Sequence, residues 1–152
     1  GDWSSDVCSS DLLSRTPVLV RAGGIIVLGG SCSKNIYDGV AQREILLFPS
    51  PPSIALSRVG TTGTFTLIED DGRTNAHTLD GAFTELELSF RILCEEGVES
   101  VEVNYAVVHA GYELLYEVIW FELPKGDARR IAAAEGRRAV VEEGRWGVRV
   151  DL

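Results

Sequence analysis

Two adjacent carboxylates, Asp70 and Asp71, are the side chains of this sequence whose type and spacing first invite a test for acid–base chemistry. Two carboxyl groups cleave a glycosidic bond with retention when they flank it about 5–5.5 Å apart and their pKa values differ. Asp70 and Asp71 are consecutive and precede Gly72, so they belong to a predicted exposed turn. We therefore predict a turn shaped by aspartate side chain-to-backbone hydrogen bonds. Bound calcium is the one functional alternative for this pair.

The other residue types that do chemistry are scattered. His77 and His109 are isolated, without partners at the spacing typical of metal ligands. No serine has a nucleophile-elbow context, and no glycine pair precedes the Gly-Lys-Ser/Thr run of a phosphate loop. We therefore predict no catalytic residue, no cofactor and no metal ion for this chain.

Cys32 and Cys94 are the two cysteines that follow the first dozen residues. A disulfide between them is expected if the protein is secreted. Cys94 falls on the apolar face of a predicted strand, however, which favours a buried free thiol.

Exposed aromatic rings would indicate a sugar-binding surface. The rings that share a strand face with Val or Leu are Tyr105, Tyr116, Trp120 and Trp146. This pattern favours a core face over a sugar platform. Three further rings, Tyr37, Tyr112 and Phe121, lie off those faces and could be exposed.

Alternation of apolar and polar residues predicts most of the elements that position these groups. The predicted strands are 64–69, 83–94, 101–107 and 113–123, separated by the turns Asp70-Asp71-Gly72, Leu79-Asp80-Gly81, Glu95-Glu96-Gly97 and His109-Ala110-Gly111. In 83–94 the apolar residues from Leu86 to Cys94 share one face. Residues 44–49 are apolar on both faces, which predicts an inner strand of a covered sheet.

The two ends of the chain give weaker patterns. Residues 16–28 contain two apolar runs around Arg21-Ala22-Gly23-Gly24, which predicts a hairpin or a strand with a glycine bend. Residues 137–142 and 145–152 predict a final hairpin. Residues 128–135 stay undecided, because their composition favours a helix in an all-β setting.

Composition supports one fold class. The 152 residues include 16 glycines and 5 prolines, with 45% hydrophobic residues. Short strands with a turn every 8–12 residues predict an all-β, antiparallel β-sandwich. The net charge of −9 argues against nucleic acid and anionic membranes as partners, because both bind clustered Lys and Arg. No apolar run approaches the roughly 20 residues of a membrane span.

The first dozen residues, GDWSSDVCSSDL, have no periodicity and resemble a translated sequencing adapter. We interpret residues 1–12 as foreign to the protein and expect them to be disordered. Setting aside Asp2, Asp6 and Asp11 changes the net charge from −9 to −6. We expect the natural chain to begin further upstream.

Two motifs resemble one known family. The hairpin Ile68-Glu69-Asp70-Asp71-Gly72 is similar to a hairpin in the C-terminal β-domains of glycoside hydrolase family 31, the α-glucosidases and α-xylosidases. Upstream, residues 17–26 resemble the motif that follows the catalytic barrel in that family. The matching residues there are Pro17, Val18, Val20, Arg21, Ala22, Gly23, Ile25 and Ile26, with Leu19 and Val27 as departures.

The resemblance implies a non-catalytic segment. The family's two catalytic aspartates lie in a barrel, which needs about 200 residues or more and is not encoded here. We expect residues 13–81 to be the remnant of a proximal β-domain and 82–152 a distal one, both bracing the missing barrel of a retaining α-glycosidase. The alternatives are an independent carbohydrate-binding module and a plain protein-interaction domain.

Overall fold

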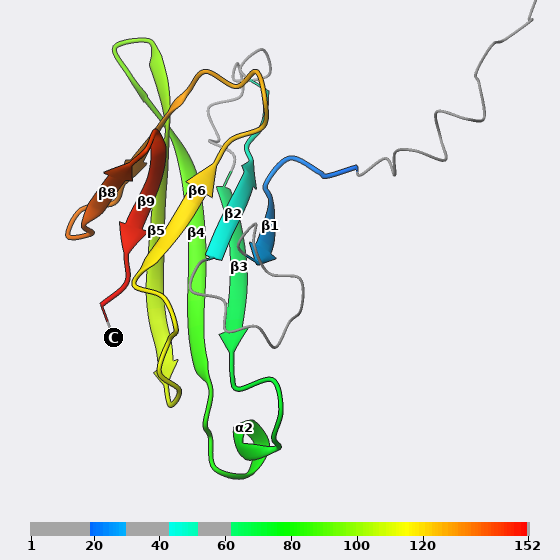
Figure 1. The fold of residues 1–152 in the computed structure, drawn as a ribbon. Helices are drawn as coiled ribbons and strands as arrows, with labels where there is room; N and C mark the ends of the chain where they lie inside the picture. Colours follow the sequence, from blue (N-terminus) through cyan, green and yellow to red (C-terminus); the bar gives the residue numbers. More distant parts are fainter. Residues whose placement is uncertain (1–18, 30–42, 52–61, 152) are drawn as a thin grey trace, which may run out of the picture.

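The computed structural model describes residues 19–29, 43–51 and 62–151 (Figure 1). Nearly all regular structure in these ranges is extended. The strands are β1 (Gly24–Gly29), β2 (Arg43–Phe48), β3 (Thr62–Glu69), β4 (Thr84–Glu95), β5 (Val98–Ala110), β6 (Val118–Glu122), β7 (Arg130–Ala133), β8 (Ala139–Glu142) and β9 (Arg145–Arg149). A single helical turn, α2 (Ala76–Leu79), follows β3.

These strands form two sheets packed face to face. The five-stranded sheet has the order β1-β2-β6-β9-β8, and the four-stranded sheet has the order β3-β4-β5-β7. In Figure 1 the ribbons of β2, β6 and β9 pass in front of those of β3, β4 and β5. The predicted all-β sandwich is confirmed. Each sheet also contains one parallel pair, β2 with β6 and β5 with β7.

Pairing across the middle of the chain corrects the expected division at residues 81 and 82. β2 lies before that point and pairs with β6, while β3 pairs along its whole length with β4. One hydrophobic core contains residues from both sides, such as Ile45 and Val148. The described strands therefore form one interleaved sandwich and not two consecutive ones.

The core follows from the alternation of β4 and β5. Leu86, Leu88 and Phe90 of β4 are at most 2% exposed, and Val101 and Val103 of β5 are fully buried. Each position between them faces outward and is polar or small. This period of two fixes which face of the four-stranded sheet packs inward.

Three local expectations are corrected. The strand predicted at 113–123 begins only at Val118, because the Tyr112 backbone is bound by the Thr84 hydroxyl and leaves the sheet. Cys94 is exposed and free rather than buried, since β4 projects beyond the core there. Phe121 is 5% exposed because it joins the core face of β6.

Other expectations are confirmed in detail. The final hairpin is present as β8 and β9, and β2 lies inside its sheet between β1 and β6. The undecided residues 128–135 include the strand β7, which pairs with β5. The expectations for residues 1–12, Cys32 and Tyr37 lie outside the described ranges.

Candidate functional site

The motif residue Glu69 lies at the end of β3 and is 8% exposed. Arg43, the first residue of β2 in the other sheet, donates to it from Nε at 2.6 Å and from Nη2 at 2.7 Å. Tyr116 donates its hydroxyl to Glu69 Oε1 at 3.1 Å. The Arg43 guanidinium also lies 5.5 Å from the centre of the Tyr116 ring. Three residues far apart in sequence thus form one cluster between the sheets.

The electrostatics of this cluster keep Arg43 charged and Tyr116 neutral. The hydrogen bond from Arg43 to Glu69 raises the pKa of the guanidinium, against the opposing effect of burial. Burial, and then the neighbouring Glu69 charge, raises the pKa of Tyr116 well above its ordinary value. The Glu69 carboxylate accepts from both Arg43 and Tyr116, so the cluster is suited to holding the sheets together.

The predicted aspartate turn is confirmed. Asp70 accepts from the Gly72 amide at 2.7 Å. Asp71 accepts from the amides of Arg73 and Thr74, both at 3.0 Å, and from the Thr74 hydroxyl at 2.7 Å. Gly72 has φ of +60°, the left-handed conformation that favours glycine.

These bonds also set the charge of Asp71. The amides of Thr74 and Arg73, followed by the Thr74 hydroxyl, lower the pKa of Asp71 to about 2. A carboxylate held ionised in this way is a poor general acid near neutral pH. The bonds therefore fit a turn that starts the connection from β3 to β4.

The two histidines have separate, local contacts. His77 Nδ1 lies 3.5 Å from Asp70 Oδ2 and 3.3 Å from the Thr74 carbonyl oxygen. His109 Nε2 lies 2.8 Å from the Gly81 carbonyl oxygen, and its ring packs against Phe83. Among residues 19–29, 43–51 and 62–151, no group of three or more His, Cys, Asp or Glu side chains is placed to hold a metal ion.

The upstream motif forms a turn before β1. The Arg21 carbonyl oxygen accepts from the Gly24 amide at 2.9 Å, and the Gly23 amide donates to Phe48 at 2.8 Å. Gly23 has φ of +87°, which accounts for a glycine at this bend. Arg21 itself is exposed.

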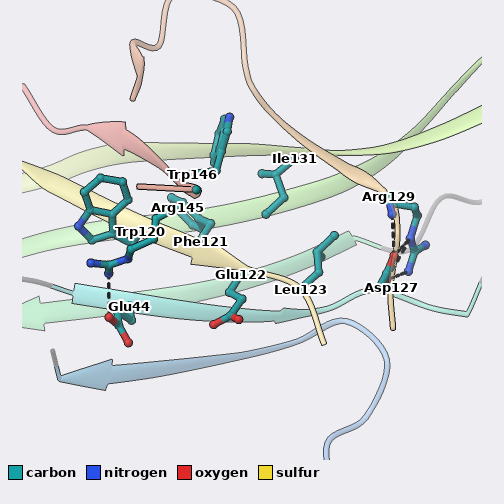
Figure 2. A pocket seen from close by; sticks show the side chains of 11 residues that line it. Glu44, Trp120, Phe121, Glu122, Leu123, Asp127, Arg129, Ile131, Arg145 and Trp146 are labelled. Carbon is teal, nitrogen blue, oxygen red and sulfur yellow. Dashed lines mark hydrogen bonds and ion pairs between the residues drawn. The ribbon is translucent and has the colours of Figure 1, made fainter. Parts of the chain in front are cut away.

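One cleft of about 470 Å³ opens at the end of the sandwich where β6 leaves the five-stranded sheet (Figure 2). Phe121, Leu123, Ile131 and Trp146 form its apolar lining. Two ion pairs flank this lining. Arg145 lies 4.5 Å from the Trp120 ring centre and donates to Glu44 at 2.7 Å.

The second ion pair of the cleft joins Arg129 and Asp127. The side chain of Arg129 is 7% exposed. It donates from Nη2 to Asp127 at 2.5 Å and from Nη1 to the Ser50 carbonyl oxygen at 2.9 Å. This hydrogen bonding lowers the pKa of Asp127 and raises that of Arg129. Sequence reasoning missed both pairs, because their partners are distant in sequence or lie in a loop. The Arg145–Glu44 pair joins β9 to β2, and Arg129 joins its own loop to the end of β2 through the Ser50 carbonyl oxygen.

The outer face of the five-stranded sheet has an apolar area on β1 and β2, bordered by Glu44, which lies opposite Leu28. Since Ile25, Ile45 and Phe121 face the core, their neighbours Ile26, Leu46 and Trp120 face outward. Ile26 pairs directly with Leu46, both are half-buried, and Leu28 beyond them is 39% exposed. Trp120 is 7% exposed because Arg145 covers it. By contrast, the outer face of β4 carries Glu85, Glu87 and Arg91.

Comparisons of the chain with protein-family models, with curated proteins and with solved structures each found no match. Within the described ranges, no helix is long and apolar enough to cross a membrane.

Proposed function

We propose that this chain is a non-catalytic C-terminal β-sandwich segment of a family 31 glycoside hydrolase, which braces the catalytic barrel of its parent protein. The parent would hydrolyse α-glycosidic bonds with retention of configuration. The observation that carries the proposal is the use of the hairpin motif: Glu69 ties the sheets together, and Asp70 and Asp71 form a turn. None of the three is arranged as an acid–nucleophile pair flanking a bond.

The part of the five-stranded sheet's outer face formed by β1 and β2 is where we expect the barrel to pack. Ile26, Leu28 and Leu46 form an apolar surface where a fully solvated sheet would carry polar residues. A barrel surface packed on this face would bury these side chains. The opposite outer face, with its glutamates, would then face water.

Aromatic exposure favours bracing over an independent carbohydrate-binding module. A module would be supported by two or three coplanar exposed rings. Among the described residues, Phe65 is the only Phe, Tyr or Trp side chain that is exposed, at 37%. Tyr105, Tyr116 and Trp120 are buried, and Trp146 is half-buried against the core.

Two experiments test the proposal. The purified chain should not hydrolyse aryl α-glucosides or α-xylosides at any pH; activity that disappears in Asp70→Asn or Asp71→Asn would contradict it. The upstream coding sequence should encode a barrel, and that barrel should bind this chain in a pull-down. Leu46→Glu should abolish the binding, while Ala106→Glu, on the outer face of the other sheet, should leave it intact.

A further inference from the structure

Strand β3 is an edge strand with an unusual composition. It pairs with β4 on one side, and no other described strand pairs with it on the opposite side. Its first seven residues, TGTFTLI, carry no charge and no proline, although the whole chain has a net charge of −9. Natural edge strands usually carry a charge, a proline or a bulge that blocks pairing with another chain. β3 has none of these between Thr62 and Ile68.

The other described edges are shorter. β7 and β8 have four residues each, and β1 has six with a glycine at either end. β3 has eight residues, and Thr64, Phe65, Thr66 and Ile68 are exposed, including the 37% exposed ring of the inward-facing Phe65. β3 is therefore the longest edge available for strand addition.

We propose that β3 pairs antiparallel with β3 of a second copy of this chain, so that the two four-stranded sheets join into one continuous sheet. A two-fold axis through Phe65 places Phe65 opposite Phe65, Thr64 opposite Thr66, Gly63 opposite Leu67 and Thr62 opposite Ile68. Side chains of the same face then lie opposite each other, as an antiparallel ladder requires. Such edge-to-edge addition is a general mode of recognition through main-chain hydrogen bonds.

The composition of β3 favours this register, because an axis through Phe65 pairs all seven uncharged residues from Thr62 to Ile68 with one another. Glu85 lies opposite Ile68 and Arg91 lies opposite Thr62 within each copy. With Phe65 on the axis, Glu85 of one copy shares a row with Arg91 of the other, and Glu87 shares a row with Ser89. A register shifted to put Thr66 on the axis would bring the two Glu87 residues into one row. An axis through Thr64 also avoids rows of like charge, but it pairs only the five residues from Thr62 to Thr66, so the register centred on Phe65 has the longer ladder.

This inference does not depend on the proposed glycosidase origin, because it uses only the edge, its exposure and its lack of charge. Sedimentation velocity of the full chain over a series of concentrations provides the first test. The dimer fraction should rise with concentration. A monomer throughout the series would overturn the proposal.

Substitutions on β3 and β5 test whether β3 forms the dimer interface. Phe65→Lys would oppose two lysines across the axis and should weaken the association constant by about tenfold or more, because like charges directly opposite destabilise a strand pair. The matched control is Ala106→Lys, which adds the same charge to an exposed position on the inner strand β5. Ala106→Lys should associate like the unsubstituted chain. Equal weakening by both substitutions would overturn the proposal.

Cross-linking tests the register and does not rely on the lysine variant. Opposed residues of an antiparallel pair have Cα atoms about 4.5–5.5 Å apart, within disulfide range. With Cys8, Cys32 and Cys94 replaced by serine, Phe65→Cys should form an intermolecular disulfide under mild oxidation. Thr66→Cys in the same background should cross-link much more slowly. Faster cross-linking at residue 66, or none at residue 65, would overturn the assigned register.

Discussion

Arg43 donates two hydrogen bonds to the carboxylate of Glu69, at 2.6 and 2.7 Å, and thereby joins the first residue of β2 to the last residue of β3. The two residues belong to different sheets and are 26 positions apart. Their side chains are 21% and 10% exposed, so the pair is largely removed from water. An ion pair in this position fixes how one sheet lies on the other.

Glu69→Gln should destabilise the fold strongly, because it leaves the Arg43 charge partly buried without its counter-charge. Removing one partner of a buried pair costs about 3–5 kcal/mol, and the residual exposure of Arg43 places the expected loss near the lower end, about 3 kcal/mol. Urea unfolding followed by circular dichroism would measure it. The matched control is Glu102→Gln, which breaks an ion pair with Arg91 whose side chain is 61% exposed. That change should cost less than about 1 kcal/mol. Similar losses for both variants would contradict a special role for Glu69.

Asp71 should make the stability of the fold sensitive to acid. Its pKa is lowered to about 2 in the folded protein from the ordinary 3.8. A lowered folded pKa stabilises the fold above pH 4, and this contribution is lost as the pH falls from about 4 towards 2. Asp71→Asn should therefore melt below the unsubstituted protein at pH 6, and this gap should shrink at pH 2. Thermal melts at several pH values would test this, and a gap that is constant with pH would refute it.

Gly63→Ala should disrupt the start of β3. A Cβ atom there would lie 2.4 Å from the Gly23 carbonyl oxygen and 2.3 Å from Phe90 Cε1. The carbonyl belongs to the backbone of the turn before β1, so relief requires the two sheets to shift. We expect a loss of about 2–3 kcal/mol, as for other overpacked sites. Gly29→Ala is the control, since a Cβ there meets nothing within 4 Å. Chemical unfolding would measure the free energy of unfolding of both variants. An unchanged value for Gly63→Ala would contradict the close approach of Gly63 to the turn before β1.

Hydrogen exchange should divide the molecule by strand. β4 and β5 share the longest pairing in the structure and lie inside their sheet, so their amides should exchange slowest. β1 lies at an edge and pairs only with β2 among the described strands, so it should exchange faster. Equal protection of β1 and β4 would contradict this prediction.

Alternation along the chain was sufficient to predict the centre of the fold. β4 and β5 are long and alternate with a period of two through residues 86–90 and 101–105, so their inward faces could be assigned from sequence there. The register shift between Glu85 and Leu86, and the continuation of β5 to Ala110 through the predicted turn, could not. The final hairpin around Glu143 and Gly144 was predicted for the same reason. Both glycines of the tight turns, Gly97 and Gly144, have positive φ.

Expectations that depended on distant partners were incomplete. Residues 130–133 form a strand because β5 supplies a parallel partner, which overrides the local preference for helix. Trp120 and Phe121 are both buried, but on opposite faces, and the cover of Trp120 comes from Arg145 in another strand. Glu69 belongs to the motif used for recognition, yet its pairing with Arg43 and Tyr116 has no local signal in the sequence.

The parallel pairing of β2 with β6 has a consequence for synthesis on the ribosome. The hairpin of β1 and β2 is separated by a long stretch of sequence from its next neighbour β6 and from the strand β9 beyond it. Long-range pairings of this kind slow folding, because the entropy cost of closing a large loop comes before the stabilising contacts form. The five-stranded sheet therefore cannot assemble until β6 and β9 have been synthesised. Until then the apolar hairpin is a natural client for chaperones that bind nascent chains.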